Sequence, residues 1–333
     1  HCLVGSEMCI RDSLYSEKQI AERDMWNSQG SPYSYVPKAF DTAMEINWSP
    51  VYSFTHDTVR YLPTSSLYYG CEVDDEAGFG GASSNGAASG TTLTDAALQG
   101  FYEVVERDAV ALWWYNQVPR PGVDLASLED PFTDRMVEFC QSQQREIALL
   151  DLTADLNIPV FAAICRRTDG PVQDIVFGFG AHMNARIAAG RAITEMCQFL
   201  TAVLNRGPDG QTLYRYADPV AHRFWREAST VTQPYLAPLP GSTTQIRDTY
   251  SPPDLKEQLF EGFERIHQLG LEVLIHDQTR PDIGLSVVKV IVPGMRHFWS
   301  RFAPGRLYDV PVALGWQKLP TPEAQLNPIC MFI

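Results

Sequence analysis

The sequence predicts an α+β fold, or equally a mixed α/β fold, in one large domain or two packed lobes. Strand-like runs rich in aromatic and β-branched residues occur together with helical segments, but without the steady βαβ rhythm of a doubly wound sheet. The chain has 333 residues, 45% of them hydrophobic and 20% charged, so it can bury a large core. Its apolar runs stay short of the ~18 residues that a membrane span needs, and we expect no membrane segment.

The first half of the chain is expected to form a hairpin, a glycine-rich loop and a long helix. Strands are predicted at 47–54 and 59–69. The small residues of 78–90 let backbone N–H groups approach a ligand, and the helix start that follows favours an anion. That helix is expected to end at Tyr115, before a proline-rich break.

The second half is expected to mix helices and strands in an irregular order. The predicted elements are a helix at 134–144, strands at 147–152, 159–165 and 174–179, helices at 186–205 and 255–269, and strands at 272–275 and 285–292. The segment 207–253 is rich in Pro, Thr, Ser and Gly, and it predicts a long surface excursion or a lid. The helix at 255–269 has charges opposite its apolar face, which is typical of a surface helix.

The long helix of the first half is apolar nearly all round, yet it carries a narrow polar stripe. At about 100° per residue, four polar residues fall within an arc of roughly 80°: Asp95, Gln99, Glu103 and Glu106. An uncompensated buried carboxylate costs on the order of several kcal/mol, so three of them need guanidinium partners, a metal ion or a wet cleft. Thr92 and Asp95 also match a capping box, which leaves plain helix capping as the other interpretation of Asp95.

The helix at 186–205 repeats this arrangement with Arg191, Glu195 and Gln198 on one face. If the two stripes face each other, their four carboxylates meet the two positive charges of Arg107 and Arg191, and about two negative charges are left over. Such an excess suits Mg²⁺, which prefers a few carboxylates plus the oxygens of a bound nucleotide. The alternative is two core helices whose polar residues pair with one another or emerge at a surface.

Several motifs occur in an order that resembles one known family. They are SSNGAASGTTLTDAALQGFYEVVERDA from Ser83, FGFGAH from Phe177, GRAITEMCQ from Gly190, IVPGMRHFW from Ile291 and the C-terminal LNPICMFI. From about Leu14 to Ile333 the chain resembles the YcaO-domain proteins, in particular the cyclodehydratases that make thiazoline and oxazoline rings in ribosomally made peptides. The resemblance implies a YcaO-like fold in which ATP and Mg²⁺ bind in a cleft between helices packed on mixed sheets.

The resemblance assigns roles to the residues of both stripes. It implies that metal ions are held by Asp95, Glu103, Glu106 and Glu195. It implies that the nucleotide is also bound by Gln99, Arg107, Arg191 and Gln198. Arg107 and Arg191 are expected to contact phosphates, and Arg191 is expected to act in catalysis. Thr91 stands where the family pattern often has Asn, and Asp95 where it often has Glu, so metal contacts there are expected to be shorter or bridged by water.

Both ends of the chain depart from the family pattern. Ring-forming members usually finish in a PxPxP tail; here Pro328 remains, but Cys330 stands at the next proline position, so the tail is either a weaker contributor to catalysis or a surface tail of no consequence. Residues 1–13 resemble translated sequencing adapter without a signal-peptide pattern, and we expect a non-native leader there. Residues 14–333 would then be a partial YcaO domain, because the family's upstream Gly- and Lys-containing segment and its helix with SxxxE and ExxER elements are not found before Tyr33.

Composition and motifs exclude several other functions. The formal charge of −14 argues against a general nucleic-acid binder, because phosphate neutralisation needs clustered Lys and Arg. The chain has no GxxxxGK[ST] loop, no GxSxG elbow and no HExxH. The cysteines outside the leader show no zinc spacing and indicate reduced thiols in a cytosol: Cys71, Cys140, Cys165, Cys197 and Cys330. Three further residues are interpreted either as lining the cleft or as structural: His182, Arg296 and His297.

The resemblance also implies a reaction and its partners. A Cys, Ser or Thr side chain of a precursor peptide attacks the preceding amide carbonyl, the oxyanion takes the γ-phosphoryl group of ATP, and phosphate leaves to give the azoline ring. A separate leader-recognition domain or protein is expected to deliver the peptide, with a dehydrogenase and a homodimer as further expectations, and with a bacteriocin as one class of product. Two alternatives stay open: a YcaO enzyme that uses another nucleophile, as in thioamide formation, and a non-catalytic peptide-binding scaffold.

Overall fold

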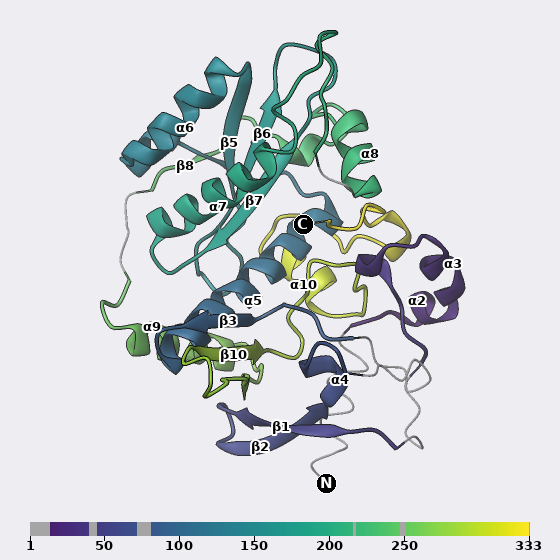
Figure 1. Cartoon of the computed structure of the whole chain (residues 1–333), viewed down its shortest axis with the longest axis vertical. Helices are drawn as coiled ribbons and strands as arrows, with labels where there is room; N and C mark the ends of the chain where they lie inside the picture. Colours follow the sequence, from purple (N-terminus) through teal and green to yellow (C-terminus); the bar gives the residue numbers. More distant parts are fainter. Residues whose placement is uncertain (1–13, 40–44, 72–80, 216–217, 247–250, 333) are drawn as a thin grey trace. The chain divides into compact units, whose positions relative to one another are not determined.

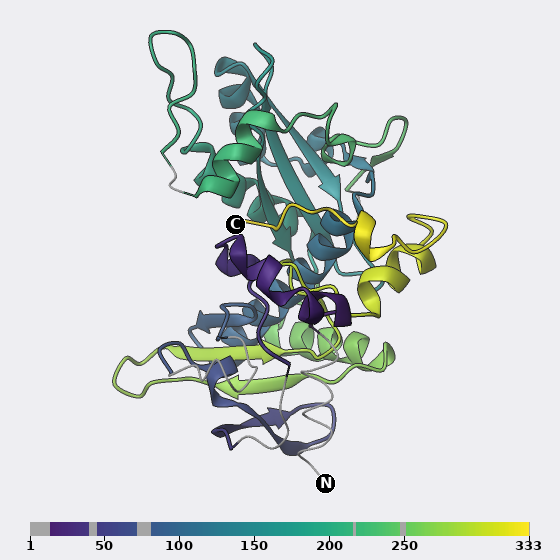
Figure 2. The same ribbon diagram turned by 90° about the vertical axis from the view of Figure 1, so that its right-hand side faces the viewer.

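The computed structural model describes residues 14–39, 45–71, 81–215, 218–246 and 251–332 (Figures 1 and 2). The chain divides into two compact units. The first consists of 1–112, 252–313 and 319–331, and the second of 113–251, 314–318 and 332–333. The division falls within the long helix α5 (Leu93–Asn116). Each unit holds one five-stranded sheet, and this mixture of helices and sheets confirms the predicted α+β class.

The sheet of the first unit has the order β2-β1-β9-β10-β3, and all its neighbours are antiparallel. Its strands are β1 (Trp48–Ser53), β2 (Thr58–Pro63), β3 (Ala87–Gly90), β9 (Leu274–Asp277) and β10 (Ser286–Ile291). The prediction that a strand reaches residue 69 is wrong. Proline has no N–H to donate, so the ladder ends at Pro63, and residues Thr64–Leu67 form the helical turn α4 instead.

Several helices belong to the first unit. They are α2 (Glu17–Ala21), α3 (Arg23–Ser28), α4, most of α5, α9 (Leu255–Gln268) and α10 (Arg306–Ala313). A Cβ at Gly100 of α5 would come within 2.4 Å of the Gly86 carbonyl oxygen, and one at Gly86 within 2.0 Å of the Val290 carbonyl oxygen. These glycines therefore bring α5 onto the loop before β3 and onto β10. Helix α9 buries one face and exposes the other, as predicted.

The sheet of the second unit has the order β7-β6-β5-β4-β8, antiparallel except for the β4–β8 pair. Its strands are β4 (Gly122–Val123), β5 (Arg145–Asp151), β6 (Val160–Arg167), β7 (Val176–Ala181) and β8 (Thr243–Thr244). Its helices are α6 (Pro131–Ser142), α7 (Ala185–Leu200) and α8 (Pro219–Glu227). Short 3₁₀ turns occur in both units at Pro32–Ser34, Leu125–Leu128, Pro234–Leu236 and Glu323–Gln325.

Helices α6 and α7 cover one face of the second sheet (Figure 1). Gly178 of β7 pairs with Ala163 of β6, two residues from Cys165, so Gly178 and Cys165 share a face. A Cβ at Gly178 would lie 2.1 Å from the backbone nitrogen of Met196 in α7, and the Cys165 sulfur lies 3.9 Å from the Cys140 sulfur of α6. The opposite face presents the aromatic rings of the β7 residues Phe177 and Phe179, which pack against rings of Trp113, Trp114 and Phe224.

Three predicted segments in the second unit need correction. The segment 207–253 is not a mere surface excursion, because it contains α8, which buries Phe224 and Trp225, and β8, which pairs with β4. Helix α6 begins three residues before the predicted start, because Asp130 caps it and Pro131 occupies its first position. Helix α7 ends at Leu200 rather than near 205; the Thr201 hydroxyl donates to the Gln198 carbonyl there.

Among the described residues, none of the helices combines the length and the apolar character that a bilayer crossing requires.

Candidate functional site

The polar stripe of α5 is present as predicted. From Asp95 to Asn116 the residues of this helix are buried, with five half-buried exceptions: Asp95, Gln99, Glu103, Glu106 and Arg107. The stripe is therefore the one side of a buried helix that keeps some access to solvent or to a ligand. Helix α5 is therefore a buried helix with one partly accessible polar side.

Glu103 is the carboxylate of the stripe that pairs with a guanidinium of the same helix. It forms an ion pair with Arg107 one turn later, and it accepts a hydrogen bond from the backbone N–H of Gly86. Burial nevertheless raises the pKa of Glu103 above its ordinary value, against the opposing effects of Arg107, Gly86 and Lys289. The Arg107 guanidinium lies 4.3 Å from the centroid of the Phe298 ring. The cations present thus do not fully compensate the Glu103 charge, which fits a carboxylate that binds a further cation.

Asp95 performs part of the capping role that its sequence position suggests. The Thr92 hydroxyl accepts a hydrogen bond from the Asp95 N–H at 3.1 Å. The Asp95 carboxylate accepts from the backbone N–H and the hydroxyl of Thr91 at 3.0 and 3.2 Å, and from the Gln99 amide at 3.4 Å. The Asp95 carboxylate therefore fixes the position of Thr91, the residue that precedes the capping residue Thr92. Thr91, singled out as a departure from the family pattern, is in direct contact with the predicted metal ligand.

A buried carboxylate that sequence reasoning missed follows the stripe directly. Asp108 is 1% exposed. It accepts from the Arg306 guanidinium at 2.7 Å and from the backbone N–H of Arg296 at 2.7 Å. These contacts fix the backbone at Arg296 and the start of α10 against α5. The sequence places this acidic residue on the apolar side of α5. Because a carboxylate is almost never buried without a partner, its position could have predicted a buried ion pair.

In the second unit, α7 places its polar face along the free edge of β7. Arg191 donates to the Ala181 carbonyl at 3.2 Å, and the Glu195 carboxylate accepts from the Phe179 N–H. The close approach depends on the FGFGAH motif, because a Cβ at Gly180 would lie 2.2 Å from the Ala188 carbonyl oxygen. Gln198, one turn further along α7, is exposed.

His182 and His297 are both buried, and each accepts a local backbone hydrogen bond. The His182 Nδ1 accepts from the Asn184 N–H at 2.8 Å, and burial together with the Arg191 charge lowers its pKa to about 4. Burial, followed by the charge of Arg107, holds the pKa of His297 well below its ordinary value. Both imidazoles are neutral at physiological pH.

The C-terminal segment is not a loose surface tail. Leu326, Asn327, Cys330 and Met331 are buried, and in the second unit the Phe332 ring packs 5.5 Å from Phe177 and 5.2 Å from Phe224, measured between centroids. The predicted alternative of a surface tail is therefore wrong for these residues. The catalytic role of Cys330 stays a prediction.

The metal ligands stay a prediction as a set. Among the described residues, no group of three or more His, Cys, Asp or Glu side chains gathers closely enough to hold a metal ion. The stripe of α5 belongs to the first unit, and Arg191 and Glu195 belong to the second. Each half is formed within its own unit, with its carboxylates engaged by Arg107, by Thr91 or by the edge of β7.

Comparisons with known proteins agree with the motifs. A family model described as YcaO cyclodehydratase, ATP- and Mg²⁺-binding, matches residues 7–296. A heterocyclase in complex with substrate and cofactor is 43% identical, with a TM-score of 0.88 over 98% of this chain and 43% of its own. The heterocyclase TruD is 41% identical, with a TM-score of 0.86 over 98% of this chain and 45% of its own. The chain thus spans less than half of each heterocyclase.

A more distant structure shares the fold. YcaO from Methanopyrus kandleri, bound with AMPPCP and Mg²⁺, is 20% identical, with a TM-score of 0.63 over 82% of this chain and 71% of its own. The half-buried acidic stripe, the glycine-mediated contact of α7 with β7, and a family model that matches most of the chain lead to one conclusion: this chain belongs to the YcaO cyclodehydratase family.

Proposed function

We propose that this chain is the YcaO part of an ATP-dependent cyclodehydratase that converts Cys, Ser or Thr residues of a precursor peptide into thiazoline or oxazoline rings. The observation that carries the proposal is the stripe on α5, where Asp95, Glu103 and Glu106 lie half-buried along one side of an otherwise buried helix. A stable core helix gains nothing from such residues, whereas a site for a cation bound to phosphates requires them. The 43% identity with a substrate- and cofactor-bound heterocyclase supports the same choice.

The residues fit ATP and Mg²⁺ by the chemistry of their donors. Asp95, Glu103, Glu106 and Glu195 would hold the metal, which when bound supplies positive charge to the phosphate oxygens. Arg107 and Arg191 would contact the phosphates, and the Gln99 and Gln198 amides would complete the nucleotide contacts. To reach this role, Arg191 would release the Ala181 carbonyl to which it donates.

The proposed reaction balances without a protein nucleophile. The peptide's own thiol or hydroxyl adds to the preceding amide carbon and loses its proton. The former carbonyl oxygen takes the γ-phosphoryl group of ATP, and ADP is released. Inorganic phosphate then leaves with that oxygen, and the amide nitrogen loses its proton as the C=N bond forms. The chain's part is to orient the phosphates and to hold charge, which is what preorganised carboxylates and guanidinium groups do.

Partners and location belong to the same proposal. A leader-recognition domain or protein would present the peptide, and a dehydrogenase would act on the azoline product. The chemistry uses ATP and free thiols, which fits a cytoplasmic enzyme. Thioamide formation by the same activated amide is the second candidate, and the mass of the product separates the two reactions.

The test uses this protein with ATP, Mg²⁺ and a leader-bearing precursor peptide from the neighbouring genes, the backbone carbonyls of which carry ¹⁸O. The peptide should lose the mass of one water per ring, and the heavy oxygen should appear in inorganic phosphate. Glu195→Ala should abolish both signals, while Glu146→Gln, which changes an exposed carboxylate of β5, should keep them. Full activity of Glu195→Ala would reject the assignment, and exchange of oxygen for sulfur in the peptide would favour thioamide formation.

A further inference from the structure

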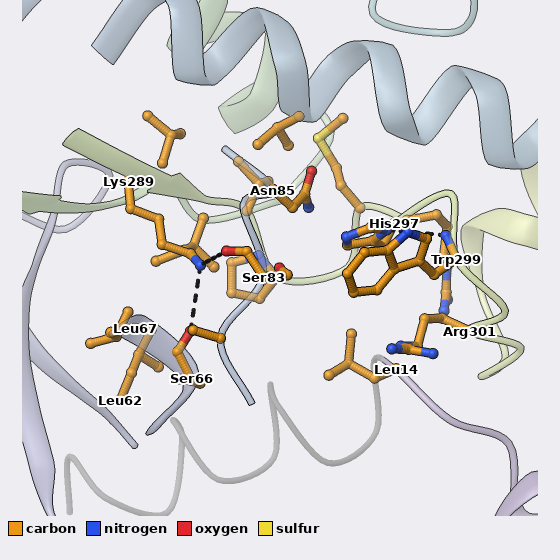
Figure 3. A pocket seen from close by; sticks show the side chains of 18 of the residues that line it. Leu14, Leu62, Ser66, Leu67, Ser83, Asn85, Lys289, His297, Trp299 and Arg301 are labelled. Atoms are coloured by element: carbon orange, nitrogen blue, oxygen red, sulfur yellow. Dashed lines mark hydrogen bonds between the residues drawn. The ribbon is translucent and has the colours of Figure 1, made fainter. Parts of the chain in front are cut away.

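The motif IVPGMRHFW, at 291–299, builds one wall of a cavity in the first unit that the reaction does not account for (Figure 3). The cavity has a volume of about 490 Å³. Figure 3 shows Lys289 on one side of it and His297, Trp299 and Arg301 on the other. A volume of this size accommodates a small ligand or a few residues of a peptide.

The cavity has an apolar floor that is continuous with a core cluster. Leu62 and Leu67 line it, and both pack with Val51 and Leu274 in the hydrophobic cluster of the first sheet. Met295, which also lines the cavity, is 7% exposed. An apolar side chain that entered here would lose its contact with water and gain contacts with an existing core.

The charged groups of the cavity are all cations. Lys289, Arg296 and Arg301 line it, and its described lining includes no carboxylate, although the whole chain carries a charge of −14. Lys289 donates to the carbonyl oxygens of Ser83 at 2.5 Å and Ser66 at 3.4 Å. The ligand that suits this lining carries hydrogen-bond acceptors and no positive charge.

The buried polar atoms of the lining that have no hydrogen-bond partner among the described residues include Asn85 Oδ1, His297 Nε2 and Trp299 Nε1. The His297 Nδ1 accepts from the Trp299 N–H at 3.0 Å, so the neutral ring carries its hydrogen on Nε2 and has a donor to offer. Together these three atoms offer two N–H donors and one amide oxygen. Peptide groups supply both an acceptor and a donor, whereas an anion supplies acceptors alone.

The cavity also adjoins the acidic stripe. Val104 lines it and follows Glu103 in α5. The Lys289 charge acts on the Glu103 carboxylate, whose pKa it lowers against the effect of burial. A ligand in the cavity is therefore held beside the carboxylates that the proposed reaction uses.

From these observations we propose that the cavity is a substrate subsite, which receives an apolar side chain of the precursor peptide together with its flanking peptide groups. The inference rests on the proposed function, since it names where the substrate of that function binds. The apolar floor accepts the side chain, the donors of His297 and Trp299 face carbonyl oxygens, and the Asn85 oxygen accepts a peptide N–H.

Photo-crosslinking with a defined probe tests this subsite. The probe is the blocked peptide Ac-Ala-Xaa-Ala-Cys-Ala-NHMe with photo-leucine at Xaa, and mass spectrometry maps the labelled positions in the full chain. Labels are expected on fragments that contain Leu62, Leu67 or Met295. The unlabelled peptide with Leu at Xaa should compete, and the peptide with Gly should compete about 10-fold more weakly because it lacks the buried side chain.

Two variants separate the apolar and the polar contributions. Met295→Trp should fill the cavity and remove the labelling, while the control Leu319→Trp, at a position 77% exposed, should leave it intact. Trp299→Phe keeps a ring and removes one donor, so affinity for the Leu peptide should fall about 5-fold, the value of one neutral hydrogen bond. Unchanged thermal unfolding of each variant shows that the fold is retained.

The outcomes distinguish failure of this inference from failure of the proposed function. Labels that map elsewhere, that survive Met295→Trp, or that disappear on addition of ATP alone would overturn the subsite, the last by assigning the cavity to the nucleotide. Glu195→Gln should lose ATP hydrolysis and keep the labelling. If the unaltered chain is labelled in the cavity but forms no ring, the proposed function fails and the subsite stands.

Discussion

The two units hold their functional side chains in different ways. In the first unit, charges are paired with charges: Glu103 with Arg107, and the neighbouring Asp108 with Arg306. In the second unit, Arg191 and Glu195 are held instead by the backbone of β7. A metal ion that binds Glu103 must therefore compete with a guanidinium, whereas a ligand of Glu195 must compete with a backbone N–H. Ion pairs therefore position the carboxylates of the first unit, and hydrogen bonds to a strand backbone position Arg191 and Glu195 in the second.

The largest effect is expected from removing the buried Asp108 carboxylate of the first unit. Asp108→Ala leaves Arg306 and the Arg296 N–H without their acceptor, and it should destabilise the first unit by about 3–5 kcal/mol. Hydrogen exchange resolved by peptide is the measurement, and protection should fall in α5 and α10. Asp282→Ala, which removes an exposed partner of Arg280, should change nothing measurable. Equal effects of the two substitutions would contradict the contrast.

The buried Lys289 gives the first unit a pH dependence. Burial lowers its pKa from an ordinary 10.5 to about 8, against the Glu103 charge. Between these values the unfolded chain binds more protons than the folded chain, so the free energy of unfolding should rise with pH. The gain should be on the order of 3 kcal/mol. Urea titrations at both ends of this range measure it.

A matched substitution isolates the Lys289 contribution from other groups that titrate in the same range. Lys289→Met should remove the rise, and Lys318→Met, at an exposed position of the second unit, should keep it. A rise that persists in Lys289→Met would show that another group is responsible.

The second unit should respond to backbone space rather than to charge. Gly180→Ala places a Cβ within 2.2 Å of the Ala188 carbonyl oxygen, so α7 must move away from β7. We expect a loss of about 1–3 kcal/mol in the free energy of unfolding, read by chemical denaturation. Gly170→Ala, with its nearest atom 4.0 Å away at the end of the Arg167 side chain, serves as the control. A tolerated Gly180→Ala would mean that the glycine does not set the helix position.

The smallest expected changes in unfolding free energy come from replacing one carboxylate in each unit by its amide, which compares the two units directly. Glu103→Gln removes a charge that burial disfavours, and it should stabilise the first unit slightly. Glu195→Gln weakens a charge-assisted bond to the Phe179 N–H, and it should destabilise the second unit by about 1 kcal/mol. Both should lose ATP-dependent activity. Changes of the same sign in unfolding free energy would show that the halves are held alike.

Elements with a strong hydrophobic periodicity could be predicted from the sequence, whereas elements that depend on distant packing partners could not. The spacing of Asp95, Glu103 and Glu106 on an apolar helix predicted the stripe, because helical geometry alone fixes which residues share a face. Helix α8 was missed because its short sequence mixes Phe224 and Trp225 with charged residues. Their partners, Phe177 of β7 for Phe224 and Tyr214 for Trp225, become evident only in the fold.

The same distinction applies to the candidate site. The identity of Arg191 and Glu195 as polar residues on an apolar helix followed from sequence, but their contacts with β7 did not, since they depend on the order of strands in a sheet. The cavity of the first unit could not be predicted from the sequence for a further reason. Residues far apart in the chain, among them Leu62, Ser83 and Lys289, line it together, and no local pattern links them.

The position of β7 at the end of its sheet has one more consequence. An edge strand with unsatisfied N–H and C=O groups invites another chain to add a strand, and in this protein the side chains of Arg191 and Glu195 occupy two of those groups. Substitutions made there to test catalysis also uncover a template for intermolecular pairing. Loss of activity in such variants is therefore interpretable only when light scattering shows that the protein has not self-associated.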